Sequence, residues 1–172
     1  ADALRFTLTA FAAQGRDVKM SESRVEGYRN FCTKLWNAAR FAEMNECKPD
    51  PNFDPASCKL TLNRWIVGKT AEAAKAAAAA IDAYRFNDAA GALYQFTWGT
   101  FCDWHLEFAK PMFQGEDEAA KAETRAATAW VLGKLLHMLH PIMPFITEEL
   151  WKSQYDADSS LIDAPWPDLP DS

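Results

Sequence analysis

The sequence predicts an all-α protein, built as a single antiparallel helix bundle. Three observations carry this prediction. Glycine is scarce, with 7 in 172 residues, runs of β-branched residues are absent, and apolar residues recur at spacings of three and four. A chain of this length suffices for one well-buried domain. We therefore expect one domain over 1–172, with a linker helix over 1–15 and an irregular tail over 156–172.

The first two helices have recognisable ends. The first runs from the start of the chain and stops at Gly15, because glycine readily takes the left-handed conformation that closes helices. The second starts near Ser21 to Ser23 and continues to about Cys47. Ser23 and Glu26 have the S-x-x-E spacing of a capping box, which predicts that Ser23 caps this helix, with Ser21 as the alternative cap.

Prolines and polar residues delimit the remaining helices. Residues 48–57 contain three prolines and form the main loop. We expect a third helix over 60–86, a fourth over 91–110 and a fifth over 115–140. Asn87 and Asp88 are predicted to cap the fourth helix and Pro111 to close it, while Pro141 ends the fifth. A short sixth helix is expected over 144–151.

Charge and composition narrow the classes of function. The net charge is −6, yet residues 1–48 hold eight Lys/Arg against six Asp/Glu, so an anionic partner should meet this N-terminal quarter. No uncharged apolar run reaches the ~20 residues that span a bilayer, and we expect a soluble protein with no membrane partner. The cysteines form no CxxC pair, which favours reduced thiols in a cytoplasmic protein; they are Cys32, Cys47, Cys58 and Cys102.

The second helix carries the clearest binding pattern. A core stripe is expected from Val25, Tyr28, Cys32, Leu35, Trp36, Ala39 and Ala42. Opposite it lies an outward row at spacings of four, three and four, formed by Asn30, Lys34, Asn37 and Phe41. Amides read base edges, aromatic rings stack on bases and cations bind phosphate, as a single-stranded RNA loop requires. The alternative is a solvated face, with Phe41 covered by the 48–57 loop or by another helix.

Other clusters favour structural roles. Cys102 and His105, with Cys47 and Cys58, lack a second tight ligand pair, so we expect cysteines in a helical core and no metal site. The carboxylates of Asp103 and Glu107 are expected to pair with an arginine from a neighbouring helix rather than to act in catalysis. Four aromatic residues of the fourth helix are expected to pack in the core rather than to line a pocket, namely Trp98, Phe101, Trp104 and Phe108.

Several stretches resemble a known family. Residues 1–41 are similar to the segment of valyl-tRNA synthetases that enters the anticodon-binding helix bundle, and GRDVKMSESRVEGYRNFxxKLWNAARF carries the valine-type match. "FCDWHLEFAKP" and "LHPIMPFITEELW" resemble motifs shared by the synthetases for valine, isoleucine, leucine and methionine, and "SLIDAPWP" the segment that closes the domain. The resemblance implies that this bundle binds the anticodon loop of the tRNA for valine, not DNA, through Lys34 and Phe41, with Arg24, Asn30 and Asn37.

The resemblance also sets expectations for the parent enzyme. It would join valine to tRNA using ATP with Mg²⁺, in a catalytic domain of the same chain, and this fragment would lack the catalytic, ATP-binding and editing residues and hold no cofactor. Lys19 to Ser23 read KMSES, but Glu22 replaces the second lysine of the ATP-binding KMSKS loop. A carboxylate there would face the triphosphate, so we expect this stretch to start the second helix instead. The isoleucine or leucine enzyme, or an acidic protein-interaction bundle, are the alternatives.

Overall fold

The computed structural model describes residues 1–12, 17 and 19–169, and within these ranges the protein is helical without any strand. This confirms the predicted all-α class. The α-helices are α1 (Asp2–Phe11), α2 (Glu22–Met44), α3 (Thr61–Asp82), α4 (Phe86–Tyr94), α5 (Glu107–Gln114), α6 (Glu118–Leu139) and α7 (Pro144–Gln154). A π-helical segment, η2 (Gln95–Leu106), joins α4 to α5, and short 3₁₀ turns lie at η1 (Pro55–Ser57) and η3 (Leu161–Asp163).

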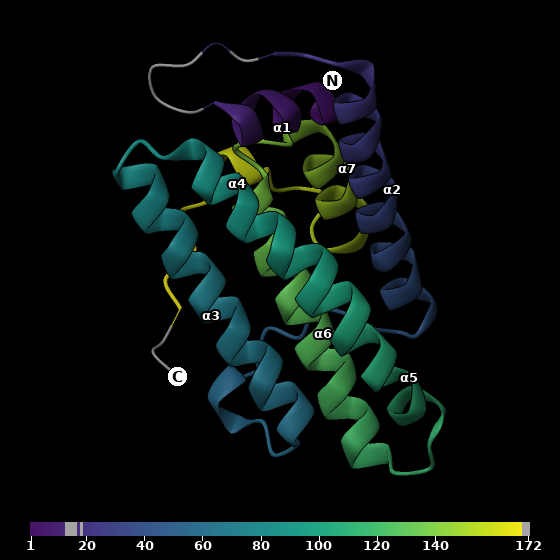
Figure 1. Ribbon diagram of the computed structural model, residues 1–172. Helices are drawn as coiled ribbons and strands as arrows, with labels where there is room; N and C mark the ends of the chain where they lie inside the picture. Colours follow the sequence, from purple (N-terminus) through teal and green to yellow (C-terminus); the bar gives the residue numbers. More distant parts are fainter. Residues whose placement is uncertain (13–16, 18, 170–172) are drawn as a thin grey trace.

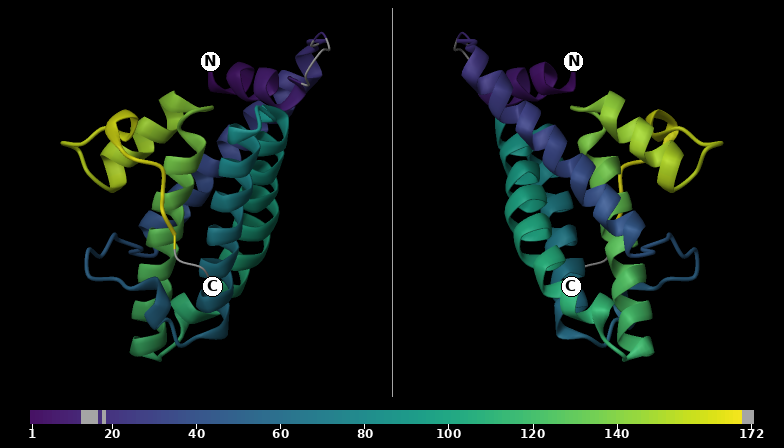
Figure 2. Two further views of the ribbon diagram at one scale, coloured as in Figure 1. Left: turned by 90° about the vertical axis from the view of Figure 1, so that its left-hand side faces the viewer. Right: turned by 90° about the vertical axis from the view of Figure 1, so that its right-hand side faces the viewer.

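The long helices lie side by side in an antiparallel bundle (Figure 1). The chain leaves α3 through a short turn, in which Tyr84 has a φ of 57°, and returns along the continuous helix α4–η2–α5. In the view of Figure 1, the long helix α6 packs behind these two. The short helices α1 and α7 lie near one end of the bundle (Figure 2). In the right-hand view of Figure 2, α2 crosses the bundle diagonally nearest the viewer. None of the described helices is long and apolar enough to span a membrane.

The start of α2 differs from the predicted capping box. The N-cap is Ser21, whose backbone is extended and whose hydroxyl accepts a bond from the Arg24 amide at 3.4 Å. Ser23 therefore lies inside the first turn, so the predicted capping box is wrong and the alternative cap, Ser21, is confirmed. Glu22 occupies the first helical position, where a carboxylate is favourable beside the positive end of the helix dipole. The stretch that resembles KMSKS does begin the helix, as expected. The predicted stop at Gly15 lies outside the described residues.

The fourth predicted helix is longer at both ends. It begins at Phe86 with Arg85 as N-cap, so Asn87 and Asp88 lie in its first turn and do not cap it. Pro111 lies inside α5, which ends only at Gln114. Pro111 and Glu107, whose carbonyl loses its helical donor, are both exposed residues, so water can bond that carbonyl and the helix continues.

The core face of α2 is rotated from the predicted stripe. Its buried residues are Phe31, Leu35, Ala38, Ala39 and Ala42. Val25, Tyr28, Cys32 and Trp36 are only partly buried. The predicted stripe missed Phe31, which is fully buried among the rings of Phe6 and Tyr94. The packing of α2 against both α1 and η2 decides this rotation. As a result, Lys34 of the outward row lies next to η2.

Charged residues of α1 fix it to the corner between α6 and α7. Asp2 is 8% exposed, and its carboxylate accepts bonds from the backbone amides of Phe145 at 3.3 Å and Ile146 at 2.6 Å. It therefore caps the start of α7 from another helix. Arg5 donates to the carbonyls of Pro141 and Ile142, both at 3.0 Å. These bonds satisfy backbone groups that the two helix ends leave without partners.

Candidate nucleic-acid interface

The four residues of the outward row lie along one side of α2, but they differ in exposure. Asn30 and Asn37 are exposed, whereas Lys34 and Phe41 are partly buried. This follows from the rotated core face, because Lys34 and Phe41 lie at the edge where α2 meets the α4–η2–α5 helix. The outward row thus follows the edge between two helices, with its two amides on the solvent side.

Lys34 is paired with an acid on the neighbouring helix. Its ammonium group donates to Asp103 Oδ1 at 3.1 Å, and the two side chains remain 35% and 48% exposed. The same Nζ lies 5.1 Å from the centroid of the Trp98 ring. A neighbouring helix supplies the partner of Asp103, as expected, but that partner is a lysine and not an arginine. For Glu107 the expectation is wrong, because it pairs with Lys110 of its own helix. A half-exposed pair of this kind stabilises the fold little.

Phe41 lies further along the boundary between α2 and the α4–η2–α5 helix, where α2 meets α5. Its ring centroid is 6.1 Å from that of Phe113 on α5, with the planes at 53°. Lys110 Nζ lies 5.7 Å from the Phe41 centroid and bonds Glu107 at 2.7 Å. Another helix therefore covers one side of the ring. Lys34 and Lys110 place two ammonium groups near aromatic faces along this boundary.

Arg24 lies apart from the row. Its guanidinium stands 4.3 Å over the Phe11 ring of α1 and donates to the Lys19 carbonyl at 2.8 Å. Ten residues at 1.5 Å each separate Arg24 from Lys34, which is roughly 15 Å along α2. The structure brings Lys34 to η2 and Phe41 to α5, and leaves Arg24 at the start of α2.

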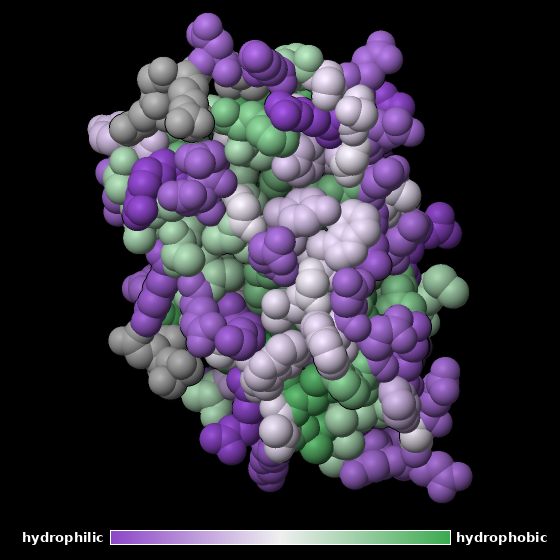
Figure 3. Space-filling model, in the orientation of Figure 1, coloured by the Kyte–Doolittle hydropathy of each residue, from purple (hydrophilic) through white to green (hydrophobic). Residues whose placement is uncertain are grey.

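Two aromatic residues that were expected in the core are exposed. Trp104 and Phe108 are 57% and 55% exposed and stack on each other at 5.7 Å, whereas Phe101 is buried and Trp98 partly so. On the face shown in Figure 3, pale and green side chains gather over the middle of the molecule, and strongly hydrophilic ones lie mainly around them. The prediction of core packing is wrong for Trp104 and Phe108 because neighbouring helices cover only one side of η2 and α5.

The buried titratable groups of η2 serve packing. His105 is fully buried, bonds the Thr128 hydroxyl at 2.9 Å and stacks on Phe101 at 5.7 Å. Burial lowers the pKa of His105 to about 4, so its imidazole is neutral at pH 7. All four cysteines are free thiols, and burial raises the pKa of Cys102 to about 12. Neither group is poised as a nucleophile or acid at neutral pH.

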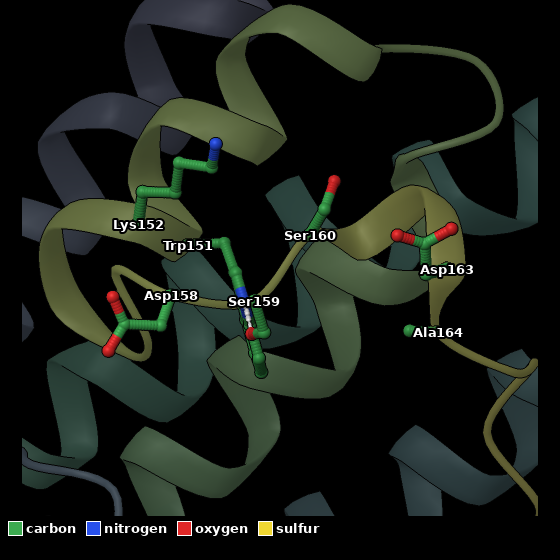
Figure 4. A pocket seen from close by; sticks show the side chains of 7 residues that line it. All are labelled: Trp151, Lys152, Asp158, Ser159, Ser160, Asp163 and Ala164. Carbon is green, nitrogen blue, oxygen red and sulfur yellow. Dashed lines mark hydrogen bonds between the residues drawn. The ribbon is translucent and has the colours of Figure 1, made fainter.

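An open pocket of about 390 Å³ lies between α7 and the C-terminal segment. It is lined by Trp151, Lys152, Asp158, Ser159, Ser160, Asp163 and Ala164. Figure 4 shows that Lys152 and Asp158 point to different sides rather than towards one centre. Trp151 Nε1 donates a hydrogen bond to the Ser159 hydroxyl at 2.9 Å and is therefore already paired. The lining groups do not converge on a ligand, and the α2 boundary is the stronger candidate.

Comparison with known proteins decides the family. The family described as "Anticodon-binding domain of tRNA ligase" matches residues 63–172. This chain belongs to that family. The anticodon-binding domain is also 59% identical over 167 residues to a valine–tRNA ligase of Bradyrhizobium diazoefficiens, covering 97% of the chain and 17% of the relative. Identity is 60% over 166 residues, again 17% of the relative, for the ligase of Rhodopseudomonas palustris. The resemblance to valyl-tRNA synthetases is confirmed.

A solved structure shares the fold of this anticodon-binding domain. It is the LeuRS–tRNA–LeuAMS ternary complex of Agrobacterium radiobacter K84, with a TM-score of 0.72 and 20% identity. The likeness covers 98% of this chain and 20% of that one. The domain therefore spans a fifth or less of the length of each of these proteins. The bundle fold extends to a leucine enzyme of low sequence identity.

Proposed function

We propose that this anticodon-binding domain belongs to a valine–tRNA ligase and binds the anticodon stem-loop of the tRNA for valine. The observation that carries the proposal is the boundary between α2 and η2–α5, where Lys34 and Phe41 lie beside exposed amides. The high identity to valine–tRNA ligases, against 20% to the leucine enzyme, supports valine as the amino acid.

Each residue has a distinct role in this proposal. Phe41 stacks on a base of the loop in this proposal, since stacking on an aromatic ring contributes about 1–3 kcal/mol per base. Asn30 and Asn37, both exposed, hydrogen-bond base edges. Lys34 supplies positive charge within the boundary. Arg24 lies roughly 15 Å away along α2, so it meets a different part of the RNA, where its guanidinium would contact phosphate.

The parent protein, in this proposal, attaches valine to its tRNA with ATP and Mg²⁺ in the cytoplasm. The catalytic domain of the same chain would carry that chemistry. In this proposal the residues described here contribute binding rather than chemistry. The domain thus supplies affinity for the tRNA and selection among tRNAs.

Binding of short RNAs by the intact ligase tests the proposal. We expect tighter binding of the valine anticodon stem-loop than of one with a changed middle base, measured by fluorescence anisotropy at fixed salt. Equal binding of both would contradict base reading and favour the acidic protein-interaction bundle. Tighter binding of an isoleucine or leucine stem-loop would instead assign the domain to one of those enzymes.

A further inference from the structure

The pair formed by Lys34 and Asp103 presents a hydrogen-bond donor beside an acceptor on the surface of the α2–η2 boundary. Nζ and Oδ1 are 3.1 Å apart, and the side chains are 35% and 48% exposed. Lysine carries three donor hydrogens, and a carboxylate accepts several bonds, so each group keeps free bonding capacity after pairing with the other. A ligand can therefore reach both groups at once from the solvent side.

The chemistry of this pair disfavours phosphate. A phosphate that approached Lys34 would also approach the carboxylate of Asp103, and like charges at this distance repel. The edge of a nucleobase is neutral and places an acceptor next to an amino or imino donor. Carboxylates accept bonds from base amino groups, and lysine donates to ring nitrogens or carbonyl oxygens. The couple is thus complementary to a base edge and poorly matched to the RNA backbone.

We propose that Lys34 and Asp103 together read the edge of one unpaired anticodon base, and that Asp103 is a specificity-determining residue. This inference rests on the proposed function. The packing around Lys34 supports this inference. The ring centroid of Trp98 lies 5.1 Å from Lys34 Nζ, and the ring restricts the positions that the ammonium group can take. Asn30 and Asn37, one turn to either side on α2, extend the row of groups that bond base edges.

Replacing Asp103 distinguishes base reading from simple pairing with Lys34, because the two roles predict opposite changes in affinity for the valine stem-loop. If Asp103 only pairs with Lys34, Asp103→Ala frees a cation and tightens binding of every stem-loop. If it reads a base, the variant weakens binding of the valine stem-loop by about ten-fold or more and lowers discrimination at one anticodon position. We expect the second result in anisotropy titrations of the intact ligase against stem-loops with all four bases at each position.

Glu107→Ala is the matched control. Glu107 lies four residues after Asp103, is exposed and pairs with Lys110, so its removal changes the net charge equally. We expect Glu107→Ala to tighten binding of all stem-loops slightly and to leave discrimination unchanged. If Asp103→Ala behaves like Glu107→Ala, base reading by Asp103 is overturned.

A salt titration of Lys34→Met gives an independent readout. A lost phosphate contact would lower the slope of log affinity against log salt by about 0.7, as for single strands. We expect the slope to stay unchanged while discrimination falls at the same position as in Asp103→Ala. A slope that drops with intact discrimination would overturn the inference but leave the proposed function standing. If the unaltered ligase fails to prefer the valine stem-loop, the proposed function itself fails.

Discussion

The two sides of the α2–η2 pair differ in how their polar groups are used. On the inner side, Phe31 and Phe101 are fully buried, and the buried imidazole of His105 is neutral at pH 7 and bonded to Thr128. On the outer side, Lys34 and Asp103 remain charged and a third to a half exposed. The inner side excludes charge, and the outer side keeps it within reach of solvent.

This difference separates stability from recognition. Burial of large apolar rings stabilises the bundle, because apolar area removed from water contributes roughly 25 cal/mol per Å². Half-exposed ion pairs contribute about 0–1 kcal/mol, so they can exchange partners at low cost. Changes on the inner side should therefore affect unfolding, and changes on the outer side should affect RNA binding.

The largest effect is expected from Phe31→Ala. The ring is fully buried against Phe6 and Tyr94, so its removal leaves a cavity and should cost about 4 kcal/mol of unfolding free energy. Urea denaturation followed by circular dichroism measures this loss. The exposed neighbour Asn30→Ala is the control and should change stability by less than about 0.5 kcal/mol. Similar losses in both variants would show that the two sides are not distinct.

The next effect is a loss of stability in acid. The pKa of His105 is lowered by burial from 6.5 to about 4, so the unfolded chain binds a proton that the folded chain does not between these values. The free energy of unfolding should therefore fall as pH drops from 6.5 to 4, by up to about 3 kcal/mol. His105→Gln should flatten this part of the profile.

Part of the acid slope should survive in His105→Gln. Burial also lowers the pKa of His137, which therefore destabilises the fold in acid in the same direction. Denaturant titrations of both proteins at several pH values isolate the share of His105 as their difference. Parallel pH profiles would contradict a neutral, buried His105.

A smaller effect is expected on the outer side from Phe41→Leu. Leucine keeps an apolar contact with Phe113 but cannot stack on a base, so binding of the valine stem-loop should weaken by about 1–2 kcal/mol. Unfolding free energy should change by less than about 1.5 kcal/mol. Anisotropy titration and urea denaturation of the same preparation separate the two quantities. Unchanged affinity would remove Phe41 from the proposed interface.

The smallest effect concerns the cap of α2. Ser21→Ala removes the acceptor for the Arg24 amide and should cost about 0.5–1 kcal/mol of stability, since the bond of 3.4 Å is long. Ser23→Ala is the matched control and should be nearly neutral. A larger loss for Ser23→Ala would restore the capping box of Ser23 with Glu26. Thermal unfolding of the two variants decides between them.

Much of the fold could be predicted from local patterns in the sequence. The errors of this prediction arise where solvent exposure or packing decides the outcome. The loop with three prolines and the end of α6 before Pro141 were predicted correctly, because proline acts on its own backbone. Pro111 was wrongly assigned as a helix end, because solvent exposure lets a helix continue past a proline. Trp104 and Phe108 were wrongly placed in the core, because composition does not tell how many sides of a helix are covered.

The sequence by itself determined the helical class, the family and the outward row on α2, because periodicity and motifs are local properties of the chain. Only the tertiary structure decided which members of that row meet η2. Lys34 and Asp103 are 69 residues apart, so no spacing rule could pair them, whereas Asn30 and Asn37 stayed exposed as the periodicity predicted. Packing against α1 and η2 set the rotation of α2, and that rotation turned a row of surface residues into a boundary between two helices.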